Sequence, residues 1–176
     1  IAVIDDRTAF GQGLADEFTK GVKAVGGAQL VSRQFTNDKA TDFTAILTNI
    51  KAAKPDVVFF GGMDAVAGPM IRQMKQLGIK AKFMGGDGIC SSGLVDLAGD
   101  GMSDEQVYCA EAGGVEGEAK AGMEKFKADF KAKYNADVQV YAPYVYDSVK
   151  VMVEAMKAAD SSEPVSYTHL TLPTSD

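Results

Sequence analysis

The chain has 176 residues, a formal net charge of −6 at pH 7, two cysteines, one histidine and no tryptophan. Hydrophobic residues make up 46% of the chain and charged residues 24%, which excludes a disordered or collagen-like protein. The acidic balance argues against a nucleic-acid surface, and a single histidine leaves little room for zinc sites or His-dependent catalysis. No apolar run approaches the roughly 18 residues that a membrane span needs, so we expect no membrane insertion of this segment.

Strand and helix patterns alternate along the first part of the chain. The sequence opens on a buried strand at 1–4, and apolar residues at helical spacing follow until a diglycine at 26–27 ends the helix. A strand at 29–35 precedes a helix capped by Thr41-Asp42. The next strand, at 57–60, is a short apolar run typical of a central parallel strand.

The alternation continues to about residue 109. A helix closed by Gly78 leads to a strand at 79–84, a short helix at 94–97 and a last strand at 106–109. This order predicts an α/β fold with a doubly wound parallel sheet. After the diglycine at 113–114 the pattern changes to two helices, at 118–134 and 143–159, so we expect a hinge or domain crossing at that diglycine.

Both ends of the chain look incomplete or foreign. The strand at 1–4 begins without a methionine or leader, so we expect truncation upstream. From Val165 the composition shifts to Thr, Ser and Leu, and the segment resembles the translation of a transposase-adaptor sequence used in library preparation. We expect 165–176 to be a non-native tail, the alternative being a native polar tail, and we leave its histidine, His169, out of every site.

Signals for catalysis are weak. The Gly11-Gln12-Gly13 segment matches a dinucleotide-binding fingerprint only in part, because Asp16 occupies the position of the third glycine. Asp5-Asp6, or Asp64 with Asp87, could form a carboxylate metal site, but loop aspartates at strand ends more often cap helices and turns. The sequence therefore predicts no cofactor, no metal and no enzymatic activity.

The two cysteines fall at the carboxyl ends of neighbouring predicted strands. Cys90 and Cys109 could form a disulfide in an oxidising compartment, or they could be two unpaired buried thiols. Neither has a histidine partner, so a catalytic thiolate pair is not expected.

The remaining signal is one of binding. Ligands of open α/β sheets bind outside the carboxyl ends of the strands, and Asp87 lies there between two glycines. A single carboxylate in such a loop suits an ammonium group, which offers three donors and a positive charge. Phe10, Met63 and Tyr141 could line a small hydrophobic slot beside it.

Several of these segments resemble the second lobe of periplasmic branched-chain amino-acid binding proteins. The resemblance spans about residues 1–159 and is carried by IAVIDD, FGQGLA, DVVFFGG, FMGGDG and YAPYVYD, in that order. It implies a two-lobed periplasmic clamp that closes over an amino acid and delivers it to the permease of an ABC transporter. By the same resemblance Asp87 binds the ligand α-ammonium, Phe10 covers the ligand and Tyr141 lines the pocket. Met63 falls where some relatives have tyrosine, which leaves the side-chain preference open.

The resemblance also implies a division of the chain. Residues 1–112 would form the ligand-binding second lobe, 113–164 would be helices returning to a missing first lobe, and 165–176 would be the tail. Two alternatives keep the fold: a ligand-sensing domain of a receptor or regulator, and a binder of amides, urea or aromatic acids. A third is an enzyme on a doubly wound sheet. The ligand and the oligomeric state stay open.

Overall fold

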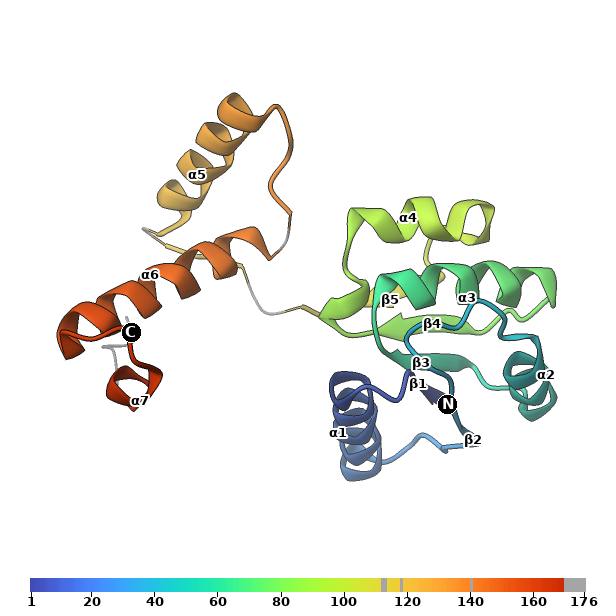
Figure 1. Ribbon diagram of the computed structural model, residues 1–176. Coiled ribbons are helices and arrows are strands. Elements are labelled where there is room, and N and C mark those ends of the chain that lie inside the picture. The colour runs from blue at the N-terminus through green and yellow to red at the C-terminus, as the bar shows by residue number, and fades with distance from the viewer. Residues whose placement is uncertain (112–113, 118, 140, 170–176) are drawn as a thin grey trace. The chain divides into compact units, whose positions relative to one another are not determined.

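A computed structural model describes residues 1–111, 114–117, 119–139 and 141–169. The chain divides into two compact units, Ile1–Gly113 and Gly114–Asp176 (Figure 1). In the described residues no helix is both long and apolar enough to cross a membrane.

The first unit is built on a sheet of five parallel strands in the order β2-β1-β3-β4-β5. They are β1 (Ala2–Asp5), β2 (Ser32–Phe35), β3 (Val57–Gly61), β4 (Lys82–Gly85) and β5 (Val107–Cys109). The chain leaves β1 for β2 on one side and returns to β3 on the other, so the strand order reverses between β1 and β3. This confirms the doubly wound parallel sheet, and ligands of such sheets bind at the carboxyl edge beside the reversal.

Helices cover the sheet because its central strands are apolar on both faces. They are α1 (Ala9–Val25), α2 (Thr44–Ala53), α3 (Asp64–Gln76) and α4 (Ser92–Ala98), with 3-10 turns at Asp87–Ile89 and Gly99–Gly101. Val3 and Phe59 point towards α1, where Phe18 stacks on Phe59 with ring centroids 3.7 Å apart. Ile4 and Phe60 point to the other face and join the larger core with residues of α2, α3 and α4.

Several element boundaries differ from the sequence expectation; β2, expected from residue 29, begins at Ser32. The strand predicted from 79 begins at Lys82, because the Ile79 amide donates to the Met74 carbonyl (2.9 Å) and so belongs to the turn that ends α3. The expected cap of α2 is also shifted, with Phe43 in the N-cap position. Asp42 instead accepts hydrogen bonds from the hydroxyl and the amide of Thr44 (2.7 and 2.9 Å). These two bonds, the hydroxyl one first, hold the pKa of the Asp42 carboxyl below its usual range.

Over its described residues the second unit has two long helices, α5 (Ala119–Tyr134) and α6 (Ala142–Ala159), and one turn of helix, α7 (Pro164–Tyr167). Phe126 of α5 meets Tyr146 of α6 with ring centroids 5.3 Å apart. Ala155 and Tyr167 are the buried residues among those described in this unit. Of the expected tail, 165–169 includes the end of α7, and 170–176 lies outside the described residues.

Helix α6 is apolar around much of its circumference. At 100° per residue, its Tyr, Val, Met and Ala side chains from 144 to 156 spread over about 220°, about twice the stripe of a helix that covers one core. Val145, Val149 and Met152 share one side and are 61%, 59% and 50% exposed. The second unit therefore leaves an apolar helix side without a partner among the described residues.

Candidate functional site

The loop after β1 is fixed by a short chain of hydrogen bonds. Asp6 Oδ1 accepts from the Thr8 amide (3.0 Å) and from the Thr8 hydroxyl (2.6 Å), and the Thr8 Oγ1 accepts from the Gly11 amide (2.9 Å). Thr8 is thus the N-cap of α1. This capped turn holds Phe10 in the first turn of the helix, where the residue is exposed.

Helix α1 approaches β3 at the level of the backbone. A Cβ atom on Gly11 would lie 2.1 Å from Asp6 Oδ1 and 2.5 Å from the Gly61 carbonyl oxygen. The contact is reciprocal, because a Cβ atom on Gly61 would lie 2.2 Å from the Gly11 carbonyl oxygen. The glycine that suggested a nucleotide fingerprint therefore allows close packing of a helix on a strand end.

The loops after β1, β3 and β4 converge on Gly88. A Cβ atom on Gly88 would lie 2.6 Å from the Gly62 carbonyl oxygen, 2.9 Å from Met63 Sδ and 3.2 Å from Phe10 Cε1. The neighbouring Asp87 is partly buried, and its carboxylate makes no hydrogen bond or ion pair with the residues that the structure describes. The Phe10 ring, the Met63 thioether and the loop that carries the unpaired Asp87 carboxylate thus meet at the carboxyl edge of the sheet, beside the strand reversal.

The other aspartates near this edge are engaged. Asp5 pairs with Arg33 (2.8 Å), and Asp64 accepts a hydrogen bond from the Ser91 hydroxyl. One oxygen of Asp6, Oδ2, is buried and has no hydrogen-bond partner among the residues that the structure describes. Across the described ranges, no three His, Cys, Asp or Glu side chains are grouped to hold a metal ion.

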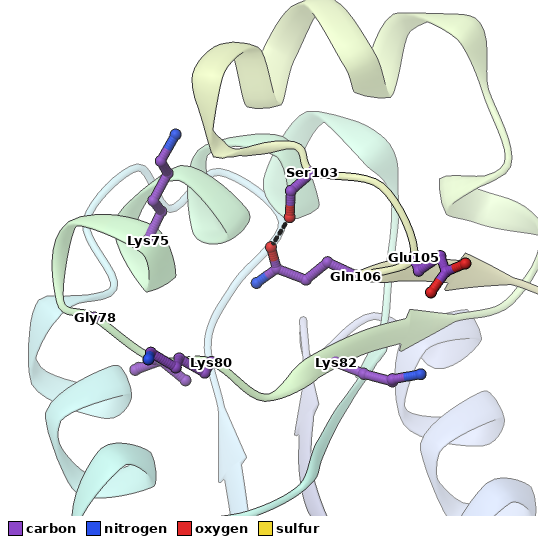
Figure 2. A pocket seen from close by; sticks show the side chains of 8 residues that line it. Lys75, Gly78, Lys80, Lys82, Ser103, Glu105 and Gln106 are labelled. Atoms are coloured by element: carbon purple, nitrogen blue, oxygen red, sulfur yellow. Dashed lines mark hydrogen bonds between the residues drawn. The ribbon is translucent and has the colours of Figure 1, made fainter.

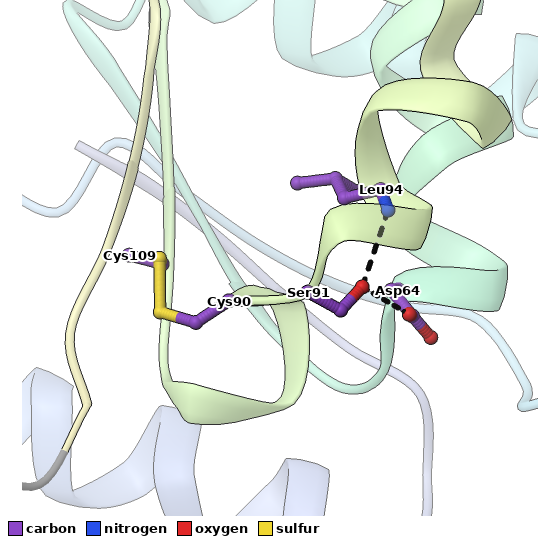
Figure 3. The surroundings of a disulfide bond; sticks show 5 residues. All are labelled: Asp64, Cys90, Ser91, Leu94 and Cys109. Carbon is purple, nitrogen blue, oxygen red and sulfur yellow. Dashed lines mark hydrogen bonds between the residues drawn. A yellow bond between two sulfur atoms is a disulfide. The ribbon is translucent and has the colours of Figure 1, made fainter. Parts of the chain in front are cut away.

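A disulfide joins Cys90 to Cys109, with the two Cα atoms 5.6 Å apart (Figure 3). Of the two alternatives left by the sequence, the structure has the bonded pair. The bond connects the loop that carries Asp87 to the end of β5. Next to the disulfide, the Ser91 hydroxyl donates a hydrogen bond to Asp64 at the start of α3. The same hydroxyl accepts from the Leu94 amide (3.1 Å) and so caps α4.

Three of the four residues predicted to contact a ligand, Phe10, Met63 and Asp87, are therefore neighbours in the first unit. Tyr141 is the N-cap residue of α6 and belongs to the second unit. From the sequence, Gly88 is one of the two glycines that flank Asp87, but its contacts with the other loops were not predicted. The available signal was the glycine itself, since a glycine in such a loop lets other loops come close.

A hollow lies at the amino-terminal edge of the sheet, opposite the edge that carries the Asp87 loop (Figure 2). It has a volume of about 440 Å³ and includes Lys75, Lys80, Lys82, Glu105 and Gln106 in its lining. Gln106 accepts from the Ser103 hydroxyl, and Lys82 Nζ donates to the Tyr108 hydroxyl (3.2 Å). Mixed charges line this open hollow, and it lies away from the edge at which parallel sheets bind ligands.

Comparison with known proteins places the chain among binding proteins. The sequence profile of the family described as "Periplasmic binding protein" matches residues 1–169. Leu/Ile/Val-binding protein homolog 1 of Brucella abortus (strain 2308) is 38% identical over 164 residues, which is 93% of this chain and 43% of that protein. The amino acid binding protein of Pseudomonas aeruginosa is 31% identical over 166 residues, with the same coverage of 93% and 43%. The chain thus spans less than half the length of these relatives.

Solved structures agree on the fold. The branched-chain amino acid transporter substrate binding protein LivJ from Streptococcus pneumoniae, in complex with isoleucine, matches with a TM-score of 0.74 at 25% identity. That match covers 94% of this chain and 46% of the other. A periplasmic binding protein type 1 from Bordetella pertussis matches with a TM-score of 0.81 at 21% identity, over 94% and 47% of the two chains. At that identity the likeness concerns the fold alone.

Proposed function

We propose that this chain, which belongs to the periplasmic binding protein family, forms the ligand-binding lobe of a carrier for branched-chain or similar aliphatic amino acids. In the full-length protein two lobes would close over the amino acid by a hinge movement, with no chemistry on the ligand. The carrier would then deliver the amino acid in the periplasm to the permease of an ABC transporter.

The observation that carries this proposal is the meeting of Phe10, Met63 and the Asp87 loop at Gly88. A free carboxylate complements an α-ammonium group, because the pair combines charge attraction with hydrogen bonds. The phenyl ring and the thioether offer an apolar surface to an aliphatic side chain. Relatives named as Leu/Ile/Val-binding proteins support the same ligand class.

The proposal is tested by titration calorimetry on the full-length protein with L-leucine, L-isoleucine and L-valine. We expect saturable 1:1 binding of at least one of them. A ligand at 100 times its Kd should also stabilise the protein against heat by about 2.7 kcal/mol. Binding of an amide, urea or an aromatic acid in place of these amino acids would contradict the proposed ligand class.

The proposal also divides the chain. Residues 1–112 would form the second lobe of the carrier, and residues 113–164 would be helices that return to its first lobe. The apolar side of α6 supports this division, because Val145, Val149 and Met152 are half or more exposed. Relatives more than twice as long have the chain length needed to cover that side.

We therefore expect Val149→Lys to destabilise the full-length protein by about 1.5–3 kcal/mol, which is the contribution of one buried aliphatic side chain. Thermal unfolding measures the change. In the 176-residue chain alone, the same substitution should lower the binding of a hydrophobic dye. Ala158→Lys is the control, because Ala158 is exposed on the polar side of α6. Equal stability of the two full-length variants would contradict the assignment of this side to a lobe interface.

A further inference from the structure

We propose that the Cys90–Cys109 disulfide positions the Asp87 carboxylate, so that the affinity for an amino acid depends on the redox state of this bond. The inference rests on the proposed function, in which Asp87 receives the ligand ammonium. It adds to that function a covalent positioning element and a sensitivity to reductants.

The disulfide acts close to Asp87 along the backbone. Asp87–Ile89 form a single 3-10 turn, and the Cys90 amide donates to the Asp87 carbonyl oxygen (3.0 Å). A displacement of Cys90 therefore reaches the Asp87 backbone through one hydrogen bond. The Asp87 side chain has no hydrogen bond of its own to the described residues that would hold it in place.

The other end of the disulfide lies on a short edge strand. β5 has three residues and, within the part of the chain that the structure describes, pairs with β4 alone; the Ala110 amide continues the ladder to the Gly85 carbonyl (3.1 Å). Cys109 is exposed and Cys90 is partly exposed, so a small reductant can reach the bond. Nineteen positions separate the two cysteines, and α4 lies between them.

On its other flank the Asp87 loop is held by weaker, non-covalent contacts. The Ser91 hydroxyl donates to Asp64 at the start of α3 (Figure 3). Ile89 is fully buried and covers Gly85, where a Cβ atom would lie 2.6 Å from Ile89 Cδ1. These contacts keep the loop attached to the lobe after reduction, so we expect the carboxylate to lose its fixed position while the lobe stays folded.

Reduction follows ordinary thiol–disulfide exchange with a dithiol. A thiolate of the reductant attacks the exposed Cys109 Sγ, forms a mixed disulfide and releases the Cys90 thiolate. The second thiol of the reductant then attacks the reductant sulfur that is bonded to Cys109 Sγ. This closes a disulfide within the reductant and releases the Cys109 thiolate. Both cysteine thiolates take up a proton, and the reductant leaves as a disulfide, having supplied two electrons.

The test compares the oxidised full-length protein with the Cys90→Ser/Cys109→Ser double variant. The probes are L-leucine and L-isoleucine, each set against its counterpart without the ammonium group, 4-methylpentanoate or 3-methylpentanoate. Removal of the disulfide should weaken amino-acid binding about tenfold, the effect of one charged hydrogen bond. It should leave the affinity for the deaminated acids unchanged, so selectivity for the ammonium group falls.

Two controls keep the test decisive. Wild-type protein treated with dithiothreitol should reproduce the double variant, and it supplies the measurement if that variant does not fold. The reductant should have no effect on the double variant itself. Unchanged amino-acid affinity without the disulfide overturns the inference, as does an equal loss for both kinds of probe, which indicates general loosening. If the oxidised wild-type protein binds neither amino acid, the proposed function fails and the inference falls with it.

Discussion

Asp87→Ala in the full-length protein is expected to weaken the binding of branched-chain amino acids by at least about 30-fold. Removing one partner of a buried, hydrogen-bonded charge pair costs about 2–5 kcal/mol, which corresponds to roughly 30- to several-thousand-fold in affinity. Asp87 is partly buried and has no protein partner among the described residues, so no neighbouring group already neutralises it. Titration calorimetry with L-leucine measures the effect.

Asp96→Ala is the matched control, because it removes the same charge from an exposed position on the nearby helix α4. It should leave the affinity for L-leucine unchanged. Asp87→Asn keeps the size of the side chain and loses its charge, so it should weaken binding strongly, whereas Asp87→Glu keeps the charge and should retain part of the affinity. Unchanged affinity in Asp87→Ala would remove Asp87 from the site.

The fold could be predicted from sequence because the pattern that encodes it is local. Val57–Phe60 is an uninterrupted apolar run, which fits a strand buried on both faces, and helical spacing follows it at once. The predicted ends of strands and helices were less accurate where a backbone amide can bond either to a neighbouring strand or to the preceding helix. Ile79 is buried and apolar like a strand residue, but its amide bonds to the end of α3, and no local pattern reveals that choice.

Part of the candidate site could be predicted for a similar reason. Parallel strands present their carboxyl ends at one edge, so loops far apart in sequence, such as those of Phe10, Met63 and Asp87, are expected to meet there. The contacts that fix their spacing could not be predicted. The role of Gly88 depends on three other residues, and the Asp6–Thr8–Gly11 chain depends on how closely α1 approaches β3.

Gly11→Ala is expected to destabilise the full-length protein by about 2–3 kcal/mol or more, at the upper end of the cost of overpacking. The added methyl group would lie 2.1 Å from Asp6 Oδ1 and 2.5 Å from the Gly61 carbonyl oxygen. Asp6 is held by Thr8, and the carbonyl belongs to a central strand, so neither can move without breaking other bonds. Urea and thermal unfolding measure the loss, and displacement of Phe10 should weaken binding of L-leucine as well.

Gly13→Ala, two residues further along the same helix, is expected to have the opposite effect on stability from Gly11→Ala. No atom of the described residues lies within 4 Å of a Cβ atom at Gly13, and alanine is about 0.5–1 kcal/mol better than glycine inside a helix. We therefore expect Gly13→Ala to stabilise the protein and to leave ligand affinity unchanged. Helix propensity alone would make both substitutions stabilising, so the opposite signs isolate the contact with Gly61 and Asp6. Similar stability of the two variants would show that α1 can move away from β3, and Gly11 would then have no special role in holding Phe10 over the site.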